Sequence, residues 1–169
     1  TRHANLVFQF SDDPDAEVRV AFSEGFDCWS ALGTDCLVEK YYKRGEATMN
    51  LALDLGTSDE ECARITLHEF GHAIGCIHEH QNPVSGIRWN EEAVYQAFSG
   101  PPNNWDRATI RHNILDRYRE DVLQGTTFDG DSIMLYEFDA ALVRNGGPIH
   151  SNSRLSTRDI AQIKKAYPK

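Results

Sequence analysis

Apolar and polar residues along this chain follow two different periods, and the change between them falls near residue 58. Apolar residues alternate with polar ones over 6–10 and 18–22, and 48–53 is a third candidate strand. From residue 58 onward the apolar residues recur mostly at helical spacing. Strands early in the chain and helices late in the chain predict an α+β domain.

The clearest predicted helix begins at Ser58, where Glu61 three residues later completes a capping box. Gly75 permits the left-handed conformation that ends a helix. One apolar stripe of this helix is expected to face the core: Ala63, Leu67, Phe70 and Ile74. An adjacent stripe is expected to line a cleft: Glu61, Ile65, His68 and His72. The same helix thus predicts both a packing face and a functional face.

Three more helices are predicted in the second half of the chain. One covers 91–99 and is capped by Asn90, and another lies around 105–112, with two prolines between them. The last helix begins at Ser156, where Asp159 completes a second capping box.

The length and composition restrict the function classes. With 169 residues, 40% hydrophobic and 25% charged, the chain is expected to form one globular domain over 1–169. Its net charge of −9 argues against nucleic acid as a partner, because phosphate binding requires clustered lysine and arginine. No run approaches roughly 20 apolar residues, so no membrane partner is expected.

The chain has four cysteines, and an even number favours disulfides in an oxidising compartment. Cys62 and Cys76 would lie about 21 Å apart along one helix, which is too far for a bridge. The simplest bridge is Cys28–Cys36, and crossed pairs such as Cys36–Cys62 with Cys28–Cys76 remain open.

The chemistry lies in residues 68–78, which run His-Glu-Phe-Gly-His-Ala-Ile-Gly-Cys-Ile-His. His68 and His72 are four residues apart, so their imidazoles project from the same face of a helix. The second glycine of the run lets the chain turn back and bring His78 to the same metal ion. Glu69 borders this face and can reach a water on the metal. Three protein ligands leave a fourth position open, which is typical of catalytic zinc.

A second, distant element supports this interpretation. An isolated H-E-x-x-H pair fits two satisfied or surface histidines about as well as it fits a metal site. The third histidine and Ser-Ile-Met-Leu-Tyr at 132–136 make that alternative weak. The H-E-x-x-H-x-x-G-x-x-H run and this Met-turn together resemble the metzincin zinc endopeptidases. Glu79 and the Met-turn are similar to the astacin group, and the ending from Leu155 to Pro168 is similar to the matrixins.

The resemblance implies a metzincin-type catalytic domain. Its small twisted mixed sheet and active-site helix would lie over a mostly irregular or helical C-terminal subdomain that ends in a helix. The N-terminal subdomain would cover about 1–77 and the C-terminal subdomain about 78–169. The usual first helix of the family has no room between Phe10 and Val18.

The activity that the resemblance implies is that of a secreted, monomeric zinc endopeptidase acting on extended protein or peptide substrates. It would hold one catalytic Zn²⁺, and calcium stays undetermined because no ligand loop of recognisable spacing is present. Two alternatives remain: a catalytically inactive zinc-binding interaction module, which is expected to lose its general base, and a metallohydrolase of a non-peptide substrate.

The resemblance also implies roles for the residues of the helix. His68, His72 and His78 would bind zinc through neutral imidazole nitrogens. Glu69 would be the general base, which takes a proton from the zinc-bound water as that water attacks the peptide carbonyl.

Roles follow for the Met-turn as well. Tyr136 would be a removable fifth zinc ligand that swings to stabilise the oxyanion, and Met134 would form an apolar floor beneath the metal. His80 competes with His78 as the third ligand, but the six-residue step from His72 to His78 is the one that matches the family.

Substrate binding is assigned by the resemblance to an edge strand at 48–53, to which an extended peptide would add in antiparallel orientation. The candidate residues along this strand are Thr48, Asn50 and Ala52. Glu137 and Asp139 follow the Met-turn and would favour basic substrates if they line a pocket.

The resemblance finally implies a partner for a mature N-terminus. Astacins use the glutamate after the third histidine, here Glu79, and matrixins use an aspartate of the last helix, here Asp159. We expect at most one of these two carboxylates to meet the α-amino group of Thr1.

Overall fold

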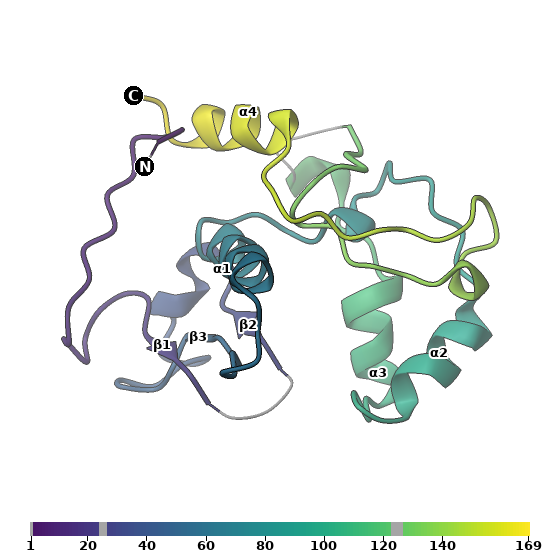
Figure 1. Ribbon diagram of the computed structural model, residues 1–169, viewed down its shortest axis with the longest axis horizontal. Coiled ribbons are helices and arrows are strands. Elements are labelled where there is room, and N and C mark those ends of the chain that lie inside the picture. Colours follow the sequence, from purple (N-terminus) through teal and green to yellow (C-terminus); the bar gives the residue numbers. More distant parts are fainter. Residues whose placement is uncertain (1, 24–26, 123–126) are drawn as a thin grey trace. The chain divides into compact units, whose positions relative to one another are not determined.

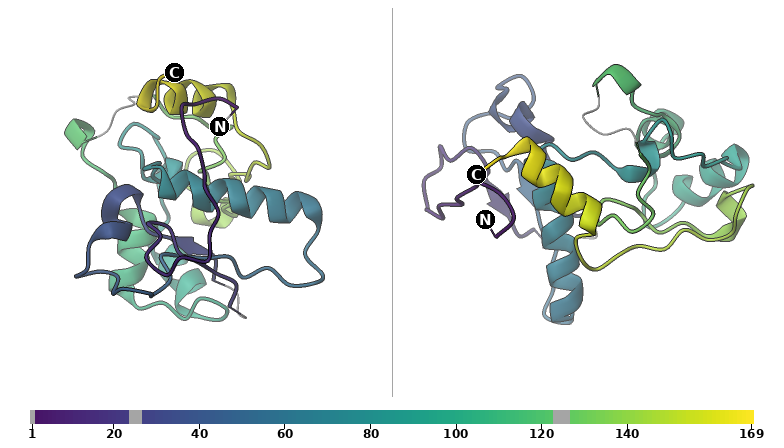
Figure 2. Two further views of the ribbon diagram at one scale, coloured as in Figure 1. Left: turned by 90° about the vertical axis from the view of Figure 1, so that its left-hand side faces the viewer. Right: turned by 90° about the horizontal axis from the view of Figure 1, so that it is seen from above.

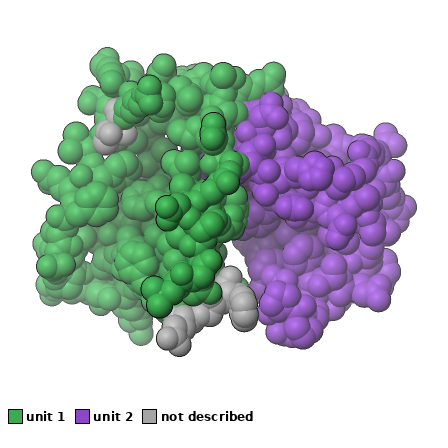
Figure 3. All heavy atoms as spheres, viewed as in Figure 1, with its two compact units in different colours: residues 1–77, 153–169 green, residues 78–152 purple. Residues whose placement is uncertain are grey.

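The computed structural model describes residues 2–23, 27–122 and 127–169. Two compact units make up the chain, one formed by 1–77 with 153–169 and the other by 78–152 (Figure 3). A small mixed sheet and helices confirm the α+β prediction (Figure 1). None of the described helices is long and apolar enough to cross a membrane. A single catalytic domain with subdomains that meet near residue 77 stays a prediction.

The sheet of the first unit has three short strands in the order β1-β3-β2. Strand β1, Val20–Ala21, is parallel to β3, Met49–Asn50, and β2, Trp29–Ser30, is antiparallel to β3. The strand predicted at 18–22 is thus confirmed in its centre, whereas β2 was not predicted.

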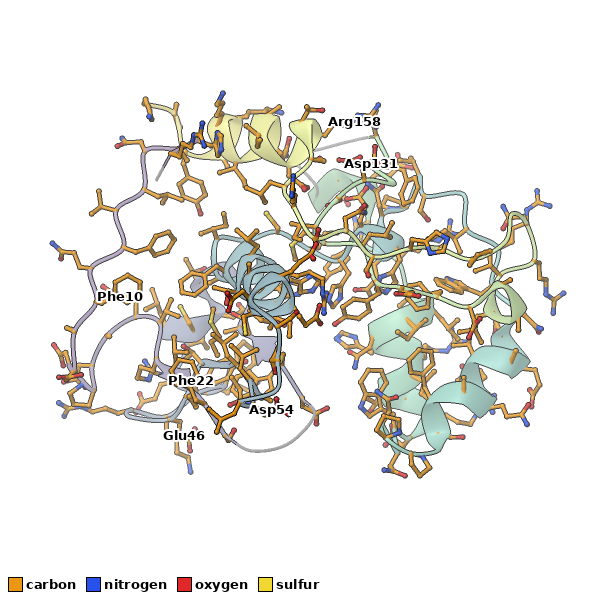
Figure 4. All side chains as sticks on the ribbon, in the orientation of Figure 1. Phe10, Phe22, Glu46, Asp54, Asp131 and Arg158 are labelled. Atoms are coloured by element: carbon orange, nitrogen blue, oxygen red, sulfur yellow. The ribbon has the colours of Figure 1, made fainter. Side chains whose placement is uncertain are left out.

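The strand predicted over 6–10 is wrong. This segment has no regular secondary structure, and Val7 and Phe10 are 82% and 88% exposed (Figure 4). Only Phe8 makes an aromatic contact, an edge-to-face packing against Phe70 with ring centroids 5.2 Å apart. The apolar alternation therefore gains no buried face, and without a neighbouring strand it does not specify a sheet.

The prediction that 48–53 forms an edge strand is also wrong, because β3 is the central strand of the sheet. The backbone amide of Thr48 donates to Arg19 O at 2.9 Å, and its carbonyl accepts from Ala31 at 2.7 Å. The Asn50 side-chain amide donates to the Asp27 carbonyl at 2.7 Å. Thr48 and Asn50 are buried and bind the neighbouring strands, so this segment offers no open edge to a peptide.

Helix α1, Asp59–Ala73, begins and ends where the sequence predicts. The Ser58 hydroxyl accepts from the Glu61 amide at 3.2 Å, and Gly75 has the left-handed φ of +91°. Only half of the expected capping box forms, because the Glu61 carboxylate binds Arg64 in the next turn. The half-formed box still supplies the side-chain cap that the helix start needs.

The residues of α1 that are most buried are not those of the apolar stripe that was expected to face the core. The apolar stripe is only partly covered, and Ala63 is exposed. The buried residues of this helix are instead His68, Glu69, Gly71 and His72. The polar face is thus the most enclosed part of the helix, a pattern that hydrophobicity alone does not predict.

All four cysteines are free thiols, so the predicted Cys28–Cys36 bridge and the crossed pairs are not formed. The Cys36 thiol donates to the Gly33 carbonyl at 3.2 Å within η1, a 3₁₀-helix over Gly33–Leu37. The Cys62 thiol lies 3.8 Å from the Thr57 carbonyl. These thiols meet local backbone oxygens instead of one another, and burial raises the pKa of Cys28 and of Cys36.

The first unit ends with α4, Thr157–Ala166, which carries the complete capping box predicted from Ser156 and Asp159. In the left view of Figure 2, α4 lies over the C-terminal half of α1. Leu155, Ile160 and Ile163 are only partly buried, so α4 is an outer layer of this unit.

The second unit is helical around its own apolar core. It contains η2 Glu79–Gln81, α2 Glu91–Ser99, α3 Arg107–Ile110, the π-turn η3 Arg111–Leu115, η4 Glu120–Val122 and η5 Ala140–Leu142. The core consists of Val94, Tyr95, Ile110, Ile114, Phe138 and Leu142. The helix predicted at 91–99 is confirmed, and the one predicted near 105–112 is divided between α3 and η3. Asn90 occupies the cap position of α2 without a capping hydrogen bond, since its amide donates to Ala141 O.

Candidate metal centre

Two histidines of the candidate centre lie on the last turns of α1. His68 and His72 are four residues apart, both are buried, and their ring centroids are 4.8 Å apart in an edge-to-face arrangement. Because both side chains project from one face of a rigid helix, their separation is set by the helix itself.

The turn after α1 orients one of these rings. The Gly75 amide donates to His72 O at 2.8 Å, and the Cys76 amide donates to Gly71 O at 2.9 Å. This turn places the Cys76 carbonyl 2.8 Å from His72 Nδ1. A carbonyl only accepts, so Nδ1 carries the proton and Nε2 keeps its lone pair for a metal.

The third histidine follows directly from this turn. His68, His72 and His78 each offer one ligand atom, and these atoms all lie within 4.8 Å of one another. Three neutral imidazoles at this spacing fit a first-row divalent ion. The residues described here contain no other such group of histidine, cysteine and carboxylate ligands.

His80 is not part of this group. Its Nε2 lies 3.0 Å from the Asn113 carbonyl of the π-turn, and its side chain is fully buried. The rival ligand therefore has a packing role within the second unit, where its ring stacks near those of both His78 and Tyr136.

Glu69 is the buried carboxylate beside the two helical histidines. It is 4% exposed, and its Oε2 has no hydrogen-bond partner among the described residues. Burial raises its pKa from 4.5 to about 7, and the positive charge of Arg64 opposes that rise. An enclosed carboxylate with a pKa near neutrality is suited to accept and return a proton.

The Met-turn is a buried segment of the second unit, from Ser132 to Leu135. The Ser132 hydroxyl accepts from the Met134 amide at 3.0 Å, and the Met134 carbonyl accepts from the Glu79 amide at 3.0 Å. The residue after His78 is thus tied to the Met-turn through its backbone. The assignment of Met134 to the floor of the metal site stays a prediction.

Tyr136 lies against the third histidine. Its ring centroid is 4.2 Å from that of His78 and 5.3 Å from that of His80. The two acids that follow the Met-turn, Glu137 and Asp139, are exposed, and their place in a substrate pocket stays a prediction. The ring contact brings Tyr136 next to a candidate ligand, and its catalytic role stays a prediction.

The two carboxylates proposed for the N-terminus both have other partners. Glu79 accepts from the Asn82 amide at 3.0 Å and from the Asp129 backbone at 2.8 Å. Asp159 accepts from the Ser156 backbone at 2.9 Å in the capping box of α4. Thr1 lies outside the described residues, so the predicted contact of its α-amino group stays a prediction.

Sequence reasoning missed the groups that support the histidines. The Cys76 carbonyl and the π-turn carbonyl of Asn113 orient imidazoles, but backbone oxygens carry no sequence signal. Arg64 lies one turn before His68 on α1, and its position was readable from the helical period.

Known proteins provide an independent comparison, although no protein-family model matches the chain. The chain is 33% identical over 125 residues to bone morphogenetic protein 1 of Xenopus laevis, covering 61% of this chain and 15% of that protein. One structure of myroilysin has 38% identity and a TM-score of 0.91, covering 99% of this chain and 81% of that chain. A second myroilysin structure has 37% identity and a TM-score of 0.71, covering 99% of this chain and 72% of that chain.

Proposed function

The chain belongs to the metzincin-type metalloproteases, the family of myroilysin, and from that premise we propose that it is a secreted zinc endopeptidase. The observation that carries this proposal is the meeting of three histidine ligand atoms within 4.8 Å beside a buried carboxylate. Its substrates are extended protein chains, and the ion is held by His68, His72 and His78.

The zinc ion would supply Lewis-acid chemistry, which polarises the peptide carbonyl and lowers the pKa of water. The three imidazoles would hold that ion with one position left open. Hydrogen bonding to Cys76 O fixes the His72 ring, so this ligand needs little reorganisation to bind.

Glu69 is the proposed proton carrier. Its carboxylate would accept a proton from the attacking water and return that proton to the leaving amine. Burial raises the pKa of this carboxyl to about 7 in the metal-free chain, and a bound Zn²⁺ would favour the ionised form, which is the form that accepts the proton. Tyr136, in ring contact with His78, is the proposed donor to the oxyanion.

Peptide binding is proposed at β2 in place of the central strand. Within the described residues β1 and β2 each pair only with β3, so the outer edge of Trp29–Ser30 is one of two edges at which an extended chain can add. Backbone hydrogen bonds at such an edge supply affinity that depends little on the substrate sequence. This arrangement favours a protease over a hydrolase of small non-peptide substrates.

The experiment compares the wild type with Glu69→Gln on an unfolded protein substrate, with and without a chelator. The wild type is expected to cleave the substrate and to lose that activity with the chelator. Glu69→Gln is expected to lower kcat by about 10²- to 10⁴-fold while bound zinc, measured by atomic absorption, stays at one ion per chain.

The outcomes separate the alternatives. Cleavage by Glu69→Gln at the wild-type rate would remove the proposed base. A wild type that binds zinc and cleaves no peptide bond would favour the inactive zinc-binding module or a non-peptide substrate. Exposed His112→Ala serves as a control that changes a histidine outside the proposed site.

A further inference from the structure

The residue that directly follows α4 reaches the end of α1. Tyr167 follows Ala166 directly, and its hydroxyl donates a hydrogen bond of 2.9 Å to the carbonyl of Ile74, 93 positions earlier in the chain. The backbone amide of Asn5 donates to the Tyr167 carbonyl at 3.0 Å, so the residue is also held through its main chain. Both contacts lie within the first unit.

Ile74 is the C-cap of α1, where the last carbonyls of a helix lack partners inside the helix. The left-handed Gly75 follows it, and the helix cannot continue to supply a donor for the Ile74 carbonyl. The Tyr167 hydroxyl takes that place. A phenol at a helix end that is otherwise closed by local backbone bonds is an additional, long-range restraint.

This restraint acts on the turn that orients a candidate ligand. Two residues after Ile74, the Cys76 carbonyl lies 2.8 Å from His72 Nδ1, and two residues after Cys76 comes His78. A rotation of the Ile74 peptide would therefore move the acceptor of one imidazole and the backbone that carries the other.

A second element, η1, lies close to the turn. A β-carbon built on Gly33, the first residue of η1, would lie 3.5 Å from the α-carbon of Gly75. The turn thus has two neighbours: η1 lies close to Gly75, and the Tyr167 hydroxyl binds the Ile74 carbonyl. A β-carbon built on Gly75 itself would meet nothing within 4 Å, so the Tyr167 hydroxyl is a restraint on a turn that is otherwise open at this residue.

We propose that Tyr167 is a positioning residue of the metal centre, which acts through the Ile74 carbonyl on the turn that orients His72 and delivers His78. The inference rests on the proposed zinc function. The phenol touches neither the ligands nor a substrate, so its effect passes through the backbone of residues 74–78.

The test is Tyr167→Phe, which keeps the ring and removes the hydroxyl. Zinc affinity is measured by competition with a chromogenic chelator, and the visible absorption spectrum is recorded for the Co²⁺-loaded protein. The variant is expected to bind zinc about 3- to 10-fold more weakly, because one restraining hydrogen bond is lost and the ligands must be ordered on binding. Its Co²⁺ bands are expected to shift, since they report ligand geometry.

A matched control separates positioning from general loosening of α4. Ser156→Ala removes the hydroxyl that accepts from the Arg158 and Asp159 amides at the other end of α4. This variant is expected to lower the unfolding temperature about as much as Tyr167→Phe does, with zinc affinity and Co²⁺ bands unchanged.

Equal losses of zinc affinity in the two variants would overturn the proposal, as would unchanged affinity and spectrum in Tyr167→Phe. A Tyr167→Phe chain that does not fold would show a purely structural bond and would overturn it too. A wild type that binds no zinc would instead be the failure of the proposed function, so the two failures are distinguishable.

Discussion

The two ends of α1 are stabilised in different ways. Its beginning is exposed and is held by local bonds: the Ser58 cap and the pair between Glu61 and Arg64, three residues apart. Its end is buried and is held by bonds from outside the helix, among them the hydroxyl of Tyr167. The buried end also encloses Glu69, whose pKa rises to about 7 because burial penalises its charge.

The difference separates stability from function along one element. The beginning of α1 carries the signals that start a helix, which a sequence can encode within four residues. The end carries groups whose burial costs free energy and whose orientation depends on partners far along the chain. Changes at the end should therefore alter metal binding and pH dependence, and changes at the beginning should alter stability and leave metal binding unchanged.

The largest expected effect follows from His72→Ala at the buried end. The free energy of structural zinc binding, about 10–16 kcal/mol for four ligands, gives about 3 kcal/mol for each ligand. Loss of one imidazole should thus weaken zinc binding by about two orders of magnitude or more and abolish proteolysis. Titration with a competing chelator measures the affinity. Affinity equal to that of the wild type would exclude His72 as a ligand.

The second effect is the pH dependence of stability in the metal-free protein. Glu69 has a folded-state pKa of about 7 against 4.5 for the unfolded chain. Because the folded state binds this proton more tightly, the contribution is fully present below about pH 4.5 and is lost as pH rises through about 7. The rise of the Glu69 pKa from 4.5 to about 7 corresponds to about 3 kcal/mol of unfolding free energy.

Urea unfolding of the chelator-treated protein at pH 5 and pH 8 measures this contribution of Glu69 to the unfolding free energy. The other titrating groups contribute in the same range, so the informative quantity is the difference between the wild type and Glu69→Gln. The wild type should lose about 2.5 kcal/mol more than Glu69→Gln between the two pH values, because part of the contribution is already lost at pH 5. Parallel curves for the two proteins would show that Glu69 titrates at its ordinary pKa when folded.

The local features of the fold were predictable from the sequence because their causes are local. Ser58, Gly75 and the capping box of Ser156 with Asp159 are signals within one helical turn, and the structure has each of them except the second half of the first box. The two prolines between α2 and α3 are a local signal too, and they separate these helices as predicted.

The sheet was less predictable because strand pairing is a long-range choice. The apolar alternation over 6–10 had no neighbour to pair with, and β2 has only two residues. The central position of β3 depends on partners at 20–21 and 29–30 that no local pattern reveals. The predicted disulfide pairing is wrong for the same reason, since bridge geometry depends on the tertiary fold.

The candidate site also combines features with local causes, which were predictable, and features with long-range causes, which were not. The spacing of His68, His72 and His78 predicted a cluster, since helix geometry and one glycine determine it, and the structure brings the three rings together. The Cys76 carbonyl and the Tyr167 hydroxyl were not predicted. Their contributions depend on where the backbone turns and on a contact across 93 positions, which sequence periodicity does not contain.

At the exposed end, Ser58→Ala should cost about 1 kcal/mol of unfolding free energy, because one helix N–H loses its side-chain acceptor. Zinc affinity and the pH dependence described above should not change. Thermal unfolding and chelator competition measure the two quantities. A loss of zinc affinity in Ser58→Ala would show that the two ends of α1 are not separable.

The smallest effect tests whether the Glu61–Arg64 pair couples the two ends. Glu61 is 44% exposed at its side chain, so its pair with Arg64 should contribute at most about 0.5 kcal/mol, and Glu61→Gln should cost no more than that at low salt. Arg64 also lowers the pKa of Glu69, and Glu61→Gln would remove one anion that competes for its guanidinium.

The Glu61→Gln variant should therefore shift the pH-dependent loss of stability in the metal-free protein to lower pH, while its zinc affinity stays at the wild-type value. Because salt screens an interaction with a buried carboxylate less than it screens an exposed pair, the pH shift should persist at about 0.5 M salt after the stability loss has disappeared. A pH curve identical to that of the wild type would mean that the exposed pair and the buried carboxylate are energetically independent.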